Sequence, residues 1–242
     1  MNSNKWAMVT GGSDRIGKSI VLQLVKMGYN IIIQYNTNED KAKKLQKKLQ
    51  KQDLVCHIIQ IDFLNIKETQ KKIKDIFNKY NISVVVNNSS SFLNSSILDD
   101  GLKTFNKVIK INLTIPYLII KSFLKIRKKG LIINILDTKI TQNETLHLDY
   151  LLSKKFLLSA TELLAFQSAP KVRINAISPG LILPPEDKDI NYLKELSKKI
   201  PLKKIGDTNH IQEALKFFIK NKFVTGQNIF LDGGEHLGQK ID

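Results

Sequence analysis

A strand-like apolar run leads through a glycine-rich turn into a helical pattern in the stretch Trp6-Ala7-Met8-Val9-Thr10-Gly11-Gly12-Ser13-Asp14-Arg15-Ile16-Gly17. Glycine lets the backbone approach a phosphate closely, and the first turn of a helix offers unpaired N–H groups and a positive dipole. A strand, a glycine-rich turn and a helix in this order therefore predict a dinucleotide-binding unit. The residues of the turn expected to contact the cofactor are Gly11, Ser13, Arg15, Ile16 and Gly17.

The rest of the chain alternates apolar, β-rich runs with amphipathic helical stretches, which is typical of a parallel sheet with crossover helices. The predicted strands are Trp6–Thr10, Asn30–Tyr35, Cys56–Ile61, Val84–Asn87, Leu131–Leu136, Arg173–Ser178 and Asn228–Leu231. The predicted helices are Ile16–Lys26, Glu39–Gln50, Ile66–Asn78, Leu102–Ile126, Asp149–Phe166, Ile190–Ile200 and His210–Ile219. No low-complexity linker or repeat divides the chain. We therefore predict one doubly wound α/β domain over residues 1–242.

Composition places the chain among globular proteins of a reducing compartment. Hydrophobic residues make up 42% and charged residues 25% of the 242 residues, close to the average for globular domains. Cys56 is the only cysteine, so no internal disulfide can form, which fits the cytoplasm. The longest apolar stretch runs from Leu113 to Ile120, contains Pro116 and is too short to cross a bilayer. We expect a cytoplasmic protein with no membrane partner.

The net charge of +16 does not by itself indicate a nucleic-acid partner. Readers of nucleic acids usually use arginine forks and clustered aromatic side chains, but Arg15, Arg127 and Arg173 are the only arginines. Most lysines occupy outward helix positions, as in residues 41–49. We expect no nucleic-acid partner, although a positive field would attract an anionic cofactor.

The end of the second predicted strand favours NADPH over NADH. An acid there would bind the ribose 2′-hydroxyl and repel a 2′-phosphate, but the strand ends Gln34-Tyr35-Asn36-Thr37-Asn38 and the first acid is Glu39. Arg15 can reach a 2′-phosphate, and Asn36 and Thr37 offer neutral donors. Asn36-Thr37-Asn38 could also simply cap the next helix, and both roles are compatible. Asp62, after the third strand, is either a hydrogen-bond acceptor for the adenine amine or a loop acid.

A tyrosine and a lysine four residues apart occur in Tyr150-Leu151-Leu152-Ser153-Lys154, on one face of a predicted helix. A nearby ammonium and a nicotinamide's positive charge both favour the phenolate form of Tyr150. Such a tyrosine is a proton donor for a carbonyl or imine that receives a hydride.

At these residues the chain resembles the short-chain dehydrogenase/reductase family, over essentially its whole length. The matching motifs are Thr10-Gly11…Gly17, Asn87-Asn88-Ser89, Asn112, Tyr150…Lys154, Ser178-Pro179-Gly180 and Leu231-Asp232-Gly233-Gly234. The resemblance implies a Rossmann-like domain with a seven-stranded sheet, assembled as a homotetramer. It implies that Lys154 holds the nicotinamide ribose and that Asn112 supports a proton relay through water. Further cofactor contacts are implied for Asn88, Ser89, Ser90, Pro179 and Gly180.

One departure narrows the resemblance to a branch of the family. The usual catalytic serine lies 13 residues before the tyrosine, where this chain has Asp137. A carboxylate would repel the alkoxide that forms in ketone reduction, but it suits a substrate with ring nitrogens and an amino group. With Arg15 and Ser90-Ser91-Phe92, Asp137 makes the chain similar to the pteridine reductases, and its C-terminal third is similar to bacterial dihydromonapterin reductases. The resemblance implies that Ser90, Asp137 and Tyr150 contact a pterin and that Phe92 stacks on it.

Two other functions remain open for this sequence. A 3-oxoacyl thioester reductase of the same family is the first, with Asp137 as the main argument against it; enoyl thioester reductases space the tyrosine and lysine more widely. The second is a catalytically silent NADPH-binding regulator. The four histidines show no metal-ligand spacing, so we expect no metal. His147 lies near the active-site segment and could line the pocket, but it is more simply explained as a surface-loop residue.

Overall fold

Seven parallel strands form one sheet in the order β3-β2-β1-β4-β5-β6-β7. The computed structural model describes residues 5–50, 55–127, 129–143 and 145–238. The strands are β1 (Trp6–Thr10), β2 (Asn30–Tyr35), β3 (Cys56–Gln60), β4 (Ile82–Asn87), β5 (Gly130–Ile135), β6 (Val172–Pro179) and β7 (Asn228–Leu231). The order reverses between β1 and β4, and parallel sheets bind ligands beyond the carboxyl ends of the strands at such a point. The Rossmann-like α/β prediction is confirmed.

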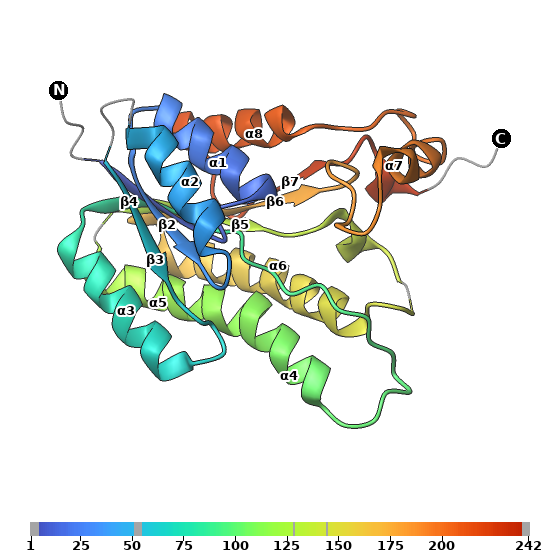
Figure 1. Cartoon of the computed structure of the whole chain (residues 1–242), viewed down its shortest axis with the longest axis horizontal. Helices are drawn as coiled ribbons and strands as arrows, with labels where there is room; N and C mark the ends of the chain where they lie inside the picture. Colours follow the sequence, from blue (N-terminus) through green and yellow to red (C-terminus); the bar gives the residue numbers. More distant parts are fainter. Residues whose placement is uncertain (1–4, 51–54, 128, 144, 239–242) are drawn as a thin grey trace.

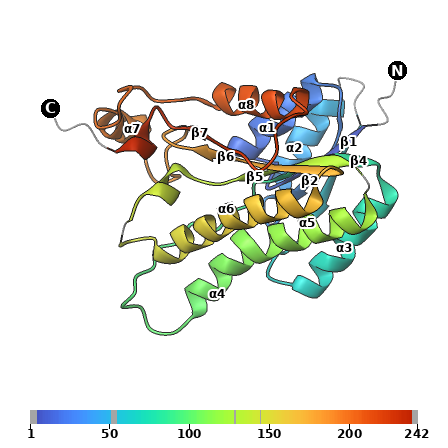
Figure 2. The ribbon, with the colours of Figure 1, turned by 180° about the vertical axis from the view of Figure 1, so that it is seen from behind.

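Helices cover both faces of the sheet. They are α1 (Arg15–Lys26), α2 (Glu39–Gln50), α3 (Ile66–Lys79), α4 (Lys103–Ile109), α5 (Ile115–Ile126), α6 (Leu148–Ser168), α7 (Ile190–Ser197) and α8 (Thr208–Lys220). Figures 1 and 2 show α1, α2 and α8 on one face, and α3, α4, α5 and α6 on the other. None of the helices in the described ranges is long and apolar enough to span a membrane.

Two apolar clusters lie on the two sides of the sheet. Ala7, Val9 and Ile33 pack with α1 and α8 in one cluster, whereas Met8, Ile32 and Val85 pack with α3 and α5 in the other. Adjacent residues of a strand point to opposite faces, so a strand covered on both faces must be apolar throughout. This explains why the continuous Ile and Val runs predicted strands correctly.

The helix predicted over Leu102–Ile126 is interrupted, which corrects that prediction. The π-helix η1 (Lys110–Thr114) separates α4 from α5, and the Ile115 N–H donates to the Lys110 carbonyl. Pro116 lies at the start of α5 and lacks the N–H that would bond the carbonyl four residues earlier, so the regular hydrogen-bond ladder cannot pass through it. Asn112 lies in this widened turn, and its side chain bonds the loop that follows β4.

Candidate active site

The glycine-rich turn after β1 is held in a shape that only glycine permits. Gly11 has φ +59°, and a Cβ on Gly17 would lie 2.1 Å from the Gly11 carbonyl oxygen. Asn88, which follows β4, clamps this turn because its Nδ2 donates to the carbonyl oxygens of Thr10 and Gly11, both at 3.0 Å. The turn and the first turn of α1 therefore leave backbone N–H groups available beside a close approach for a phosphate.

Gln34 ties this turn to its neighbours, a role that the sequence did not reveal. Its Oε1 accepts from Gly11 N at 2.9 Å and from Ser89 Oγ at 3.1 Å. Its Nε2 donates to the Ile61 carbonyl at 2.9 Å. One buried amide thus joins the ends of β1, β2, β3 and β4.

The cavity at this edge has a volume of about 580 Å³ and is lined by most of the predicted cofactor residues. These are Gly11, Ser13, Arg15, Ile16, Gly17, Asn36, Thr37, Asp62, Asn88, Ser89 and Ser90. Asp62 also serves its own loop, since its Oδ1 accepts from Leu64 N at 2.9 Å.

Two cations, Arg15 and Lys41, line this cavity. Arg15 has φ +49°, a left-handed conformation that favours glycine, and its Nη2 donates to the Pro184 carbonyl at 2.6 Å. Lys41 on α2 forms an ion pair with Asp14, the N-cap of α1. This hydrogen bond raises the pKa of Lys41, so its ammonium remains charged beside Asn36 and Thr37.

At the carboxyl end of β5, Tyr150 and Asp137 are joined by a hydrogen bond. The Tyr150 hydroxyl donates to Asp137 Oδ2 at 2.6 Å, while Asp137 Oδ1 accepts from Lys139 N at 2.9 Å and caps the 3-10 helix η2 (Thr138–Thr141). Tyr150 is 5% exposed. One oxygen of Asp137 thus faces the reactive tyrosine, and the other holds the backbone of η2.

Lys154 lies one helical turn beyond Tyr150 and is fully buried at its ammonium end. Its Nζ donates to the Ile135 carbonyl at 2.8 Å and lies 5.6 Å from the centre of the Tyr150 ring. Burial lowers the pKa of Lys154 to about 8, while the Asp137 carboxylate acts to raise it. The ammonium can therefore stabilise negative charge on Tyr150 at neutral pH.

Asn112 links the loop after β4 to α6. Its Oδ1 accepts from Ser91 N at 2.7 Å and from Ser90 Oγ at 3.3 Å. Its Nδ2 donates to the Ser91 carbonyl and to Ser153 Oγ, both at 3.0 Å. These contacts set the position of Ser90 and Ser91 relative to the helix that carries Tyr150.

A second cavity, of about 360 Å³, is lined by Asp137, the hydrogen-bond partner of Tyr150. Phe92 stands edge-on to Tyr150 with ring centres 4.7 Å apart and is 49% exposed. His147 packs against Phe92 at 4.1 Å and lines the cavity, which corrects its interpretation as a surface-loop residue. Glu235, which the sequence did not single out as a site residue, also lines it.

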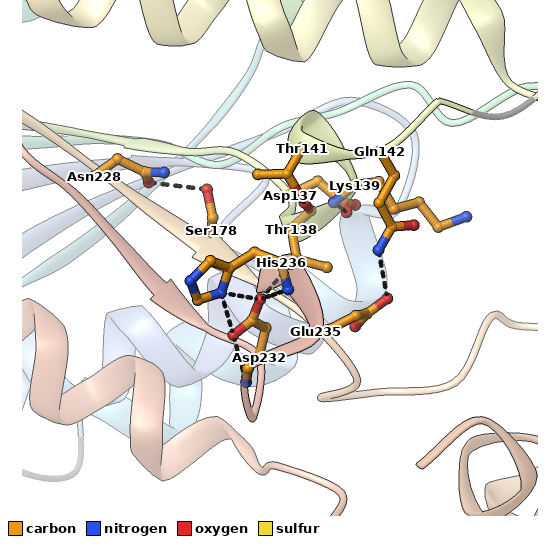
Figure 3. Close-up of polar contacts among 11 residues, drawn as sticks. Asp137, Thr138, Lys139, Thr141, Gln142, Ser178, Asn228, Asp232, Glu235 and His236 are labelled. Carbon is orange, nitrogen blue, oxygen red and sulfur yellow. Dashed lines mark hydrogen bonds and ion pairs between the residues drawn. The ribbon is translucent and has the colours of Figure 1, made fainter. Parts of the chain in front are cut away.

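Gly180, which follows β6, and Glu235, which follows β7, both line this cavity. Pro179 ends β6, and a Cβ on Gly180 would lie 2.6 Å from Asp232 Cβ. Asp232 accepts from Thr138 Oγ1 and from the backbone N–H of Gly234 and His236, as Figure 3 shows around Asp232. Burial acts to raise the pKa of Asp232, but these hydrogen bonds outweigh it and lower the pKa. Across the described ranges, no three acidic, histidine or cysteine side chains gather as a metal site.

Comparisons with known proteins agree with this geometry. The family described as enoyl-(acyl carrier protein) reductase matches residues 12–236. A 3-oxoacyl-[acyl-carrier-protein] reductase FabG of Buchnera aphidicola subsp. Schizaphis graminum is 32% identical, over 96% of this chain and 98% of its own length. The chain belongs to the short-chain dehydrogenase/reductase family.

Solved structures of similar proteins cover essentially the same length. The FolM alternative dihydrofolate reductase 1 from Brucella suis, in complex with NADP, superposes with a TM-score of 0.93 at 28% identity, over 100% of this chain and 98% of its own. A blue fluorescent protein from a metagenomic library, in complex with NADPH, superposes with a TM-score of 0.87 at 27% identity, over 97% of this chain and 99% of its own. As a short-chain dehydrogenase/reductase the protein is an oxidoreductase, and Asp137 is its departure from the family's usual serine.

Proposed function

We propose that the protein is an NADPH-dependent dihydropteridine reductase, which converts a 7,8-dihydropterin to the tetrahydro form. The hydrogen bond from Tyr150 to Asp137 is the observation that carries this proposal. The likeness to the FolM alternative dihydrofolate reductase 1 from Brucella suis, solved in complex with NADP, supports the same substrate class.

NADP(H) is the cofactor, and the residues at the first cavity fit it. Gly17 leaves free the space beside Gly11 that any side chain would fill, which suits a pyrophosphate against the backbone. Arg15 and Lys41 supply positive charge where a 2′-phosphate would lie. Positions 36 and 37, after β2, carry the neutral residues Asn36 and Thr37, so no acid there repels the phosphate. We assign the cofactor to this cavity, with Lys154 holding the nicotinamide ribose.

NADPH supplies the hydride, which C6 of the dihydropterin ring receives, and the protein supplies a proton to N5. Tyr150 donates that proton, and the ammonium of Lys154 stabilises the phenolate left behind. A phenolate facing the Asp137 carboxylate at 2.6 Å is unfavourable because the two negative charges repel each other, and this repulsion favours the return of a proton from solvent to Tyr150. Phe92 is half exposed and would stack on the flat substrate, and Ser90 lines the first cavity.

A second candidate is a 3-oxoacyl thioester reductase, which the Buchnera relative favours by its name. Its alkoxide product would form close to Asp137, and a carboxylate there raises the energy of the transition state. The third candidate is a catalytically silent NADPH-binding regulator. Such a regulator would have no need of the arrangement of Tyr150, Asp137 and Lys154, so this arrangement argues against it.

One panel of substrates separates the three candidates. Dihydromonapterin, dihydrobiopterin, dihydrofolate and acetoacetyl thioester are each offered with NADPH, and NADPH oxidation is followed. We expect turnover with the dihydropterins. Turnover with the thioester alone would refute the proposal, and binding of NADPH without turnover of any substrate would indicate the regulator.

A further inference from the structure

Glu235 lines the second cavity, called the substrate cavity below, and one oxygen of its carboxylate accepts no hydrogen bond from the described part of the chain. It begins the 3-10 helix η3 (Glu235–Leu237) directly after Gly233-Gly234. Its Oε1 accepts a long, weak hydrogen bond from Gln142 Nε2 at 3.5 Å, and Figure 3 shows Gln142 reaching toward it from the end of η2. Its Oε2 is shielded from solvent and has no hydrogen-bond partner in the described part of the chain.

A buried carboxylate oxygen without a donor is costly, so its partner is expected to come from outside the chain. Burial raises the pKa of Glu235; the Gln142 hydrogen bond acts to lower it, and the charges of Asp137 and Asp232 raise it further. Burial and the two neighbouring carboxylates disfavour the charged form of Glu235 and outweigh the Gln142 hydrogen bond, which favours it. A ligand that brings N–H groups to this oxygen would relieve them.

The position of Glu235 fits one part of a pterin ring. Asp137, which accepts from Tyr150, lines the same cavity as Phe92 and Glu235, and the proposed function puts the reacting C=N bond at Asp137 and Tyr150. Gly180 leaves room for Glu235, because a Cβ there would lie 2.9 Å from Oε2. A flat ring with its reacting bond at Tyr150 therefore turns its opposite, pyrimidine edge toward Glu235.

We infer that Glu235 is a specificity-determining residue that accepts hydrogen bonds from the amino group and the adjacent ring N–H of a 2-amino-4-oxopyrimidine. This inference rests on the proposed function and names the part of the substrate that the enzyme selects. A carboxylate matches two neighbouring donors. A 3-oxoacyl thioester offers no such donors and would leave Oε2 unpaired, so Glu235 also acts against that substrate.

The test compares two ligands and two variants by calorimetric titration of the NADP-loaded protein. The ligands are a dihydropterin and the same ring without its 2-amino group. Glu235→Gln keeps the side-chain size but replaces one acceptor by a donor. Asp187→Asn is the matched control, because Asp187 lines the same cavity but is 74% exposed and pairs with Lys188.

We expect the wild type to bind the amino-bearing ring about 10- to 100-fold more tightly than the ring without it, as for a charge-assisted hydrogen bond. Glu235→Gln should lose this preference, whereas Asp187→Asn should keep it. Glu235→Met removes both acceptors and should lose it as well. Unchanged NADPH affinity in each variant shows that the fold is intact.

Retention of the preference in both Glu235 variants would overturn the inference. NADPH oxidation by the wild type separates this result from failure of the proposed function. If the wild type reduces dihydropterins while the variants keep the preference, only the role of Glu235 is wrong. If the wild type neither binds nor reduces any dihydropterin, the proposed function is wrong and this inference falls with it.

Discussion

Replacing Asp137 by asparagine removes the charge that faces Tyr150 while it keeps the side chain's structural contact. Asparagine is as good an N-cap as aspartate, so the bond from Lys139 N to the side-chain oxygen survives and η2 stays in place. At the other oxygen an NH₂ group replaces the acceptor that Tyr150 uses at 2.6 Å. The hydroxyl of Tyr150 can then only accept a hydrogen bond from residue 137, and the hydrogen bond that Tyr150 donates to the carboxylate is lost.

The size of the effect follows from the hydrogen bond that is lost. A hydrogen bond to a charged group contributes about 1.5–3 kcal/mol. If it acts fully in the transition state, kcat/KM for a dihydropterin should fall about 10- to 150-fold. The free energy of unfolding should change by less than about 1 kcal/mol, because the cap remains. Asp137→Ala loses the cap as well and should be less stable by about 1 kcal/mol.

NADPH oxidation with a dihydropterin gives kcat/KM, and urea denaturation gives the stability of each variant. Asp137→Ser provides the comparison, because it rebuilds the serine that ordinary ketone reducers carry at this position. We expect it to lose pterin reduction and to gain weak reduction of acetoacetyl thioester. An Asp137→Asn variant with wild-type kcat/KM would refute the role of this carboxylate. A wild type that reduces the thioester well, and improves with serine, would favour the thioester reductase.

Three further predictions concern the cofactor and the proton donor. Arg15→Gly and Lys41→Ala should each weaken NADPH binding about tenfold and NADH binding much less, and calorimetric titration with both cofactors measures this; equal losses would exclude a 2′-phosphate contact. Tyr150→Phe should abolish turnover but leave the NADPH dissociation constant unchanged, whereas substantial residual turnover would exclude Tyr150 as the proton donor. Burial lowers the pKa of Lys154 to about 8 from 10.5. Below pH 8 the folded protein carries the unfavourable buried charge, and between pH 8 and 10.5 it has lost this proton while the unfolded chain still holds it. The stability of the wild type relative to Lys154→Met should therefore rise by about 3 kcal/mol across this window in urea denaturation; a flat difference would contradict the burial of this charge.

The sequence alone predicted the sheet well because burial on both faces leaves a local pattern. The bounds of β1, β2 and β7 are as predicted, since a doubly covered strand must be apolar along its whole length. The glycine-rich turn was also predictable, because Gly17 has to lie against Gly11, and that requirement acts over a few residues.

Other features depended on contacts between distant parts of the chain. Lys41 is one of many lysines on an outward helix face, and only the packing of α2 brings it to Asp14 at the cofactor cavity. Gln34 is a polar residue in an apolar strand, and its role appears only when β1 and β4 lie beside it.

The resemblance singled out Phe92 and Asp137, but only the tertiary structure shows that they line one cavity together with His147 and Glu235. Phe92 follows β4, His147 precedes α6 and Glu235 follows β7, so no local periodicity relates them. The carboxyl ends of parallel strands meet at one edge of the sheet, which brings these side chains to Tyr150. Sequence patterns report which residues are buried, but the partners of a buried polar atom are set by the distant segments that fold against it, as the contacts of Gln34 with Gly11, Ile61 and Ser89 show.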